Sequence, residues 1–146
     1  MIKSKGFTLM EVIAVIAILS ILLAFGTSST KYYSKISRDI ETEEFIASFE
    51  NLLSLSKVEA INRDSILYLR IENTTKKIKL EHNSSVIESM KIPEYINNYG
   101  KVRMSITSDG QLDSETLIFE NLEDRERYYF KIRVGVDFVN FEKKNF

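Results

Sequence analysis

The chain has 146 residues, enough for one modest domain. Its 20 Lys and Arg nearly balance its 21 Asp and Glu, so no basic excess favours nucleic acid and no acidic excess favours a disordered tail. The absence of cysteine excludes disulfides and thiolate metal sites. The sustained apolar sequence lies almost entirely between Phe7 and Phe25, which predicts an anchor followed by a soluble domain.

The apolar run from Phe7 to Phe25 predicts a membrane-spanning helix. About 19 residues at about 1.5 Å each give roughly 28 Å, close to the hydrocarbon thickness of a bilayer. Lys3 and Lys5 precede the run, so the positive-inside rule places the N-terminus in the cytoplasm. A secretory signal peptide is the alternative, but its apolar region is usually shorter, and 24–26 is a poor version of its cleavage site.

Glu11 is the one charged residue inside this run. A carboxylate near the end of a spanning helix costs about 1–3 kcal/mol on insertion scales, and such a residue usually has a partner. The run from Phe7 to Phe25 contains no Lys or Arg that could be this partner. Taken alone, Glu11 is equally compatible with a tolerated charge that reaches toward the lipid headgroups.

The residues around Glu11 resemble the cleavage motif of type IV prepilins. In Lys5-Gly6-Phe7-Thr8-Leu9-Met10-Glu11, a basic leader ends in Gly, Phe follows, and Glu comes four residues later, ahead of a long apolar helix. The resemblance implies that a prepilin peptidase cuts between Gly6 and Phe7 and that the new amino group of Phe7 is N-methylated. Glu11 of one subunit could then pair with the Phe7 ammonium of its neighbour, and a buried pair fixes register more than it adds stability.

Residues from Lys31 to about Arg63 predict a continuation of the anchor helix. Tyr33, Ile36, Ile40 and Ala47 follow helical spacing. Four further residues widen this apolar stripe: Phe45, Phe49, Leu52 and Leu53. The acidic cluster at 41–44 is interpreted as a solvated face, with a contact between subunits as the alternative.

Beyond Asp64 the apolar pattern changes from helical to alternating, which predicts about six or seven short strands. The strands are expected around 67–71, 78–80, 86–92, 102–106, 117–119, 128–134 and 136–138. Pro93 should end the third strand or place it at a sheet edge. One long helix followed by short strands predicts an α+β fold, in which a small antiparallel sheet packs on the second half of the helix. The expected organisation is a leader at 1–6, a transmembrane helix at 7–29 and a globular pilin-like domain at 30–146.

A second resemblance covers more of the chain. The helix end from Ser56 to Asp64, and the pattern of strand, Gly turn and strand in 106–110 and 117–119, are similar to the GspH/FimT group of minor pseudopilins and minor pilins, which has ComGD-like counterparts in competence systems. This resemblance implies a minor subunit of a filament.

The sequence argues against catalysis and against DNA binding. His82 is the only histidine, and no cofactor or metal site is expected around it. Some FimT-like pilins bind DNA through Gly-Arg-x-Arg, but the matching segment here, 135–138, has no arginine. The nearby cations alternate with acidic residues and leave little uncompensated charge for phosphates. These cations are Arg125, Arg127, Lys131, Arg133, Lys143 and Lys144.

The sequence therefore predicts a minor pilin or pseudopilin of a type IV pilus, a type II secretion system or a competence pseudopilus. Its expected partners are the prepilin peptidase, other pilin or pseudopilin subunits, membrane lipid and, indirectly, the assembly platform and its ATPase. It should be a single-pass protein of the cytoplasmic membrane that later joins an extracytoplasmic filament. The alternative is a membrane-anchored extracytoplasmic binding domain that does not polymerise.

Overall fold

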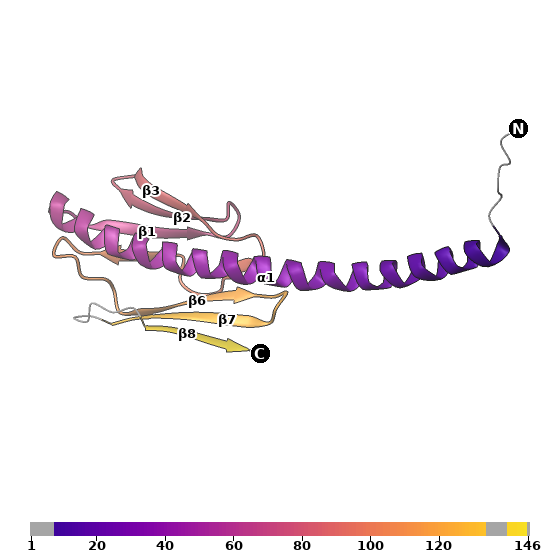
Figure 1. Cartoon of the computed structure of the whole chain (residues 1–146). Helices are drawn as coiled ribbons and strands as arrows, with labels where there is room; N and C mark the ends of the chain where they lie inside the picture. Colours follow the sequence, from indigo (N-terminus) through magenta and orange to yellow (C-terminus); the bar gives the residue numbers. More distant parts are fainter. Residues whose placement is uncertain (1–7, 134–139, 146) are drawn as a thin grey trace, which may run out of the picture. The chain divides into compact units, whose positions relative to one another are not determined.

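The computed structural model describes residues 8–133 and 140–145, and for 24–31 it describes the backbone without the side chains. The chain divides into two compact units, Met1–Ile40 and Glu41–Phe146. A single helix, α1 (Leu9–Arg63), contributes to both (Figure 1). The predicted helix and its end near Arg63 are thus confirmed.

The end of α1 is fixed by its backbone geometry. Asp64 has a φ of 44°, the left-handed conformation that commonly closes a helix. The amide of Ser65 donates to the carbonyl of Ala60 at 3.2 Å, and the amide of Asp64 donates to that of Ile61 at 3.2 Å. These two bonds form a Schellman motif and turn the chain directly toward the first strand.

Within the described residues, eight strands follow the helix and form two four-stranded sheets in which all neighbouring strands are antiparallel (Figure 1). The first sheet has the order β3-β2-β1-β5, and the second has the order β4-β6-β7-β8. The first comprises β1 (Leu67–Glu72), β2 (Lys77–His82), β3 (Ser85–Lys91) and β5 (Arg103–Ile106). The second comprises β4 (Ile96–Asn98), β6 (Glu115–Asn121), β7 (Glu126–Ile132) and β8 (Asn140–Asn145). The α+β fold with a long helix and antiparallel strands is confirmed.

The division into two sheets differs from the single sheet that the sequence predicted. The chain passes from the first sheet to β4 in the second, returns to β5, and crosses again to β6. The sequence missed β4 because three residues, two of them Asn, are too few to show alternation and have low strand propensity. The Gly turn at 107–111 closes a short antiparallel bridge between Ile106 and Leu112, and the chain then crosses to β6 in the second sheet.

The edge position predicted for the strand before Pro93, which is β3, is confirmed. Asn83 and Ser84 connect β2 to β3, with φ values of 46° and 70°, as a two-residue turn with both central residues left-handed requires. β3 is an edge strand and ends two residues before Pro93. The predicted strand at 136–138 and the predicted end of its predecessor at Val134 lie outside the described residues.

The core of the second unit is built on one face of α1. Phe49 is fully buried and contacts Phe130 and Phe119, with ring centroids 4.8 Å and 5.6 Å away. Within the apolar stripe that the sequence predicted, Phe45 and Phe49 are buried, whereas Tyr33 and Ile40 are 69% and 61% exposed. The buried helix residues are Thr42, Phe45, Phe49, Leu52, Leu53, Ser56 and Ala60.

Candidate functional site

The first turn of α1 is closed by a reciprocal pair of side chains. The backbone amide and the hydroxyl of Thr8 donate to Oε2 of Glu11 at 2.8 Å and 3.0 Å. The amide of Glu11 donates back to the Thr8 hydroxyl oxygen at 3.3 Å. This is a capping box, in which Thr8 precedes the helix and Glu11 is its third residue. The capping box fixes the start of the helix at Leu9.

Of the three predicted site residues, only Glu11 lies within the described part of the chain, and Gly6 and Phe7 lie outside it. The sequence reasoning looked for a cation beside Glu11 and missed Thr8, which supplies two neutral donors. The sequence contains the pattern that would have predicted this contact, because Thr-x-x-Glu ahead of an apolar run is the capping-box motif. The local geometry thus gives Glu11 a partner on its own chain.

The helix that follows Glu11 carries exposed apolar side chains in all directions. At 3.6 residues per turn, Ile13, Ile18, Leu19 and Ile21 point to different sides of α1, and they are 55%, 58%, 52% and 57% exposed. The hydroxyl of Ser20 donates to the carbonyl of Ile16 at 2.8 Å, so it needs no external partner. A helix that is apolar all round requires apolar surroundings. In the part of the chain that the structure describes, no helix has an apolar stretch long enough to cross a bilayer.

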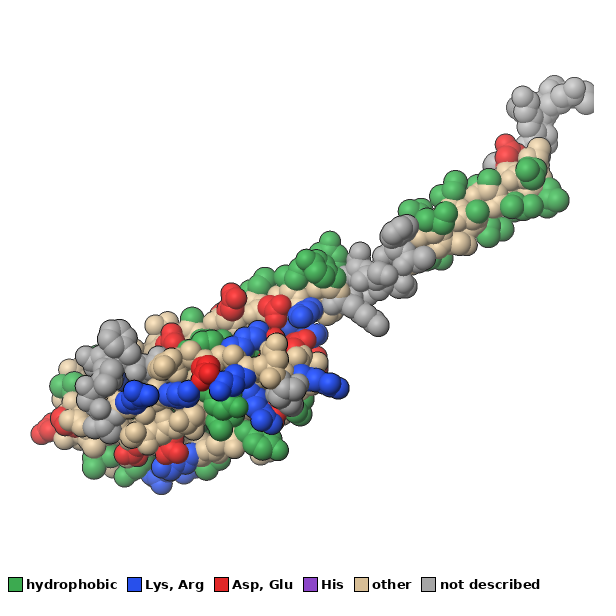
Figure 2. Space-filling model, turned by 90° about the horizontal axis from the view of Figure 1, so that it is seen from below, with side chains coloured by type: hydrophobic (Ala, Val, Ile, Leu, Met, Phe, Trp, Pro, Cys, Tyr) green, Lys and Arg blue, Asp and Glu red, His purple; other side chains and the backbone are tan. Residues whose placement is uncertain are grey.

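The cations near the C-terminus are largely paired with carboxylates. Lys131 and Lys144 lie 2.5 Å and 3.1 Å from the carboxylate oxygens of Glu142 and lower the pKa of that group. Arg127 contacts buried Glu120 at 2.9 Å. Figure 2 shows blue and red side chains interspersed on this side of the domain. Little positive charge is left over here for a phosphate backbone, and the absence of DNA binding stays a prediction.

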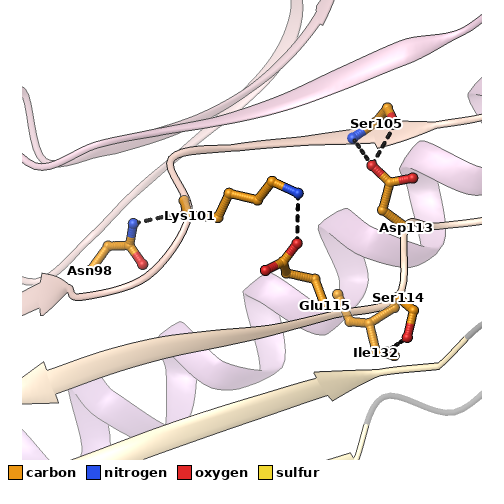
Figure 3. Close-up of polar contacts among 7 residues, drawn as sticks. All are labelled: Asn98, Lys101, Ser105, Asp113, Ser114, Glu115 and Ile132. Carbon is orange, nitrogen blue, oxygen red and sulfur yellow. Dashed lines mark hydrogen bonds and ion pairs between the residues drawn. The ribbon is translucent and has the colours of Figure 1, made fainter.

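A set of polar contacts, which we call the polar seam, joins β4, β5 and β6 to the segments that connect the two sheets (Figure 3). The Lys101 ammonium lies 2.7 Å from Glu115, which raises the pKa of Lys101. The amide and hydroxyl of Ser105 donate to Asp113 at 3.2 Å and 2.6 Å and hold the pKa of that carboxyl below its ordinary value. The Asn98 side chain donates to the carbonyl of Lys101 at 3.1 Å.

The contacts of the polar seam join structural elements and do not form a reaction centre. No group of three His, Asp or Glu residues within the described ranges could hold a metal ion. The capping box at Glu11 and the exposed apolar side chains of Leu9 to Leu23 direct attention to the N-terminal segment.

Comparison with known proteins also points to the N-terminal segment. Residues 1–27 match the family model described as the prokaryotic N-terminal methylation motif. No curated protein matches. Among solved structures, the minor pseudopilin EpsH from the Type 2 Secretion System of Vibrio cholerae has 14% sequence identity and a TM-score of 0.46, over 68% of this chain and 92% of that one. Over residues 1–27, the chain is thus similar to proteins that carry the prokaryotic N-terminal methylation motif.

Proposed function

We propose that this chain is a minor pilin or pseudopilin subunit, which a prepilin peptidase cleaves after Gly6 before it assembles into a filament. The observation that carries the proposal is the methylation motif at residues 1–27, within which the helix from Leu9 to Leu23 carries exposed apolar side chains on all sides. The filament is a type IV pilus, a type II secretion pseudopilus or a competence pseudopilus. We propose no catalytic role for the chain.

In this proposal the segments of the chain have separate roles. Residues 1–6 are the leader, 7–29 anchor the subunit in the lipid of the cytoplasmic membrane, and 30–146 lie on the extracytoplasmic side. Lys3 and Lys5 favour a cytoplasmic N-terminus. The assembly platform and its ATPase act on the anchored, cleaved subunit, whose new N-terminal residue, Phe7, is methylated.

Glu11 has a double role in this proposal. Both bonds from Thr8 reach Oε2, so Oε1 has no partner among the described residues. Oε1 is therefore available to the Phe7 ammonium that cleavage creates on a neighbouring subunit. The capping box holds the carboxylate at the first turn of the helix, and a cation at Oε1 does not require that cap to break. Such a charged pair in apolar surroundings specifies how adjacent helices align.

Substitution of Gly6 tests the processing step. With Gly6→Leu in the full chain, we expect the membrane-bound protein to retain residues 1–6, because the larger side chain obstructs the peptidase. Mass spectrometry of the N-terminal peptide should show a methylated Phe7 in the wild type and in a Ser4→Ala control. A wild-type chain that keeps an intact leader in cells with an active prepilin peptidase contradicts the proposal and favours a membrane-anchored domain that does not polymerise.

Two variants separate the charge of Glu11 from its capping role. Glu11→Gln keeps a capping box but has no charge, so we expect normal cleavage and poor incorporation into filaments. Thr8→Val keeps the charge and weakens the helix start by about 1 kcal/mol, so incorporation should be nearly normal. Immunoblots of sheared filaments measure incorporation. The reverse pattern, with Thr8→Val excluded and Glu11→Gln incorporated, would show that the cap matters and the pairing does not.

A further inference from the structure

The outer face of the first sheet carries a row of cations. In the strand register, Arg70 of β1 lies directly opposite Lys79 of β2 on one side and Arg103 of β5 on the other. Like charges in opposed positions disfavour the sheet. The guanidinium of Arg103 lies 3.9 Å from the ring centroid of Tyr68, and exposed Lys77 is close by on β2. We call Arg70, Lys77, Lys79 and Arg103 the basic face.

The carboxylates around the basic face neutralise only part of its positive charge. Glu72 lies 2.8 Å from Lys79, and Glu81 lies 3.6 Å from Arg70. Within the described ranges, Arg103 and Lys77 form no ion pair, and Asp113 beside β5 accepts from Ser105. On the second sheet, by contrast, Arg127, Lys131, Lys143 and Lys144 all have a carboxylate within 3.1 Å. The basic face therefore retains positive charge that this chain does not neutralise.

A groove with the opposite charge lies at the other edge of the first sheet, between α1 and the end of β3. It has a volume of about 350 Å³. Its floor is apolar, because Phe45, Ile92 and Pro93 are buried. Its remaining lining residues are Glu41, Glu44, Ser48, Met90, Lys91 and Glu94.

The rim of this groove, which we call the acidic groove, carries an excess of negative charge. Glu41, Glu44 and Glu94 are exposed and form no ion pair with any residue that the structure describes, and Lys91 is the one cation in the lining. An apolar floor beneath carboxylates suits Lys and Arg side chains, which lay their aliphatic stems on apolar surface and keep their charged ends at the rim.

We propose that the basic face of one copy docks against the acidic groove of a second copy. The two surfaces are different parts of the domain, because the basic face spreads over β2, β1 and β5 while the acidic groove lies between α1 and β3, and they come nearest where Lys77 lies opposite Lys91. A contact between two different surfaces of the same chain is heterologous, so it can repeat from copy to copy as a filament requires. The inference deepens the proposed function, on which it rests, by naming the domain surfaces that meet.

The absence of native cysteine allows a direct test in the full-length chain expressed in bacterial membranes. Ser48→Cys places a thiol in the acidic groove, and Val102→Cys places one beside Arg103 at the start of β5. The two variants carry different tags and are treated with a short bismaleimide linker. We expect a cross-linked dimer when both variants are present and no dimer from either variant alone.

Charge variants test whether the contact depends on the proposed complementarity. Arg70→Glu with Arg103→Glu in the Val102→Cys chain should lower the cross-link yield roughly tenfold. Glu41→Lys with Glu44→Lys in the Ser48→Cys chain should restore it. Lys144→Glu, on the second sheet, is the matched control and should leave the yield unchanged.

Three results overturn the proposal: a dimer from one variant alone, a cross-link only to a different protein, or no cross-link between processed chains. Leader removal is scored on the same samples by the size of the chain. Processed chains that do not cross-link refute the docking proposal and leave the proposed function standing. Chains that are never processed refute the proposed function, whatever the cross-linking shows.

Discussion

Gly110 is a residue whose identity the structure explains directly. Its φ of 80° lies in the left-handed region, and an added Cβ would lie 2.8 Å from Cδ1 of Ile61. The turn that contains it packs against the Ile61 side chain of α1, which would have to shift to admit a Cβ, while the left-handed φ itself favours glycine. This contact fixes where the chain leaves β5 on its way to the second sheet.

Gly110→Ala should therefore destabilise the domain by about 1–3 kcal/mol, because it combines backbone strain with a steric clash. Urea unfolding of the full chain in detergent micelles, followed by circular dichroism, measures the loss. Gly100→Ala is the matched control, since its Cβ would meet the Ile118 nitrogen at an ordinary 3.4 Å. Equal unfolding midpoints for Gly110→Ala and wild type would contradict this account.

At the level of single residues, the sequence predicted which side chains are buried better than it predicted which residues lie opposite each other on neighbouring strands. The alternating pattern identified Leu69 and Leu80 correctly as core residues of neighbouring strands, and they lie directly opposite each other. It did not predict that Arg70 would face Arg103, because β5 comes far later in the chain and its register is decided by tertiary packing.

Along the second half of α1, two faces carry apolar residues at helical spacing. Phe49 is fully buried, whereas Val58 on the outward side is 53% exposed. Periodicity detects both stripes and cannot say which one packs on the sheets. The sequence therefore grouped Tyr33 and Ile40 with Phe45 and Phe49 in one apolar stripe, whereas Phe45 and Phe49 are the ones that meet the aromatic residues of β6 and β7 in the described part of the chain.

The two faces of α1 should respond differently to truncation. Phe49→Ala should cost about 3–5 kcal/mol, because it leaves a cavity among Phe45, Phe119 and Phe130. Val58→Ala, on the same helix but half-exposed, should change the free energy of unfolding by about 0.5 kcal/mol or less. Thermal unfolding of the full chain measures both changes. Similar costs for the two variants would show that the helix packs differently from the structure described.

At the scale of the whole β-domain, the stability of the two-sheet arrangement depends on polar contacts as well as on the core. Asn73, in the β1–β2 turn, donates to the carbonyl of Asn98 at 2.8 Å and accepts from its amide at 2.9 Å. The Lys76 ammonium in the same turn reaches the carbonyls of Glu94 and Ile96 at 2.8 Å and 2.6 Å. Both side chains tie the first sheet to the segment that forms β4.

Asn73→Ala should loosen this junction. It leaves the amide and carbonyl of buried Asn98 unpaired, which should cost about 1–3 kcal/mol and speed hydrogen exchange at the Asn98 amide. Asn73→Asp keeps the acceptor for that amide and should protect it better than Ala does. Exchange measured by mass spectrometry on peptides that cover 94–101 distinguishes the variants. Unchanged protection in Asn73→Ala would mean that the pairing of β4 with β6 is sufficient to hold the junction.

The broad class of this molecule could be read from its sequence, because a helical period followed by a period of two is local information. The assignment of strands to two sheets could not, since it depends on β4, a three-residue strand held by Asn73 and Lys76 from a distant turn. The N-terminal motif was found from the sequence because it is a contiguous pattern. The basic face was missed because its cations come from three strands that are separated along the chain.

The edge strands of the sheets have a consequence for a protein that is crowded among copies of itself. On β3, the outward amide of Ser89 is occupied by Oε1 of Glu88 at 3.1 Å, and a bulge interrupts the pairing register near Leu80. β8 presents Lys143 and Lys144 at the other outer edge. Features of this kind discourage two sheets from joining edge to edge. Copies concentrated before assembly can therefore meet through side chains without merging their backbones, so the contacts between them stay reversible and do not lead to amyloid-like aggregation.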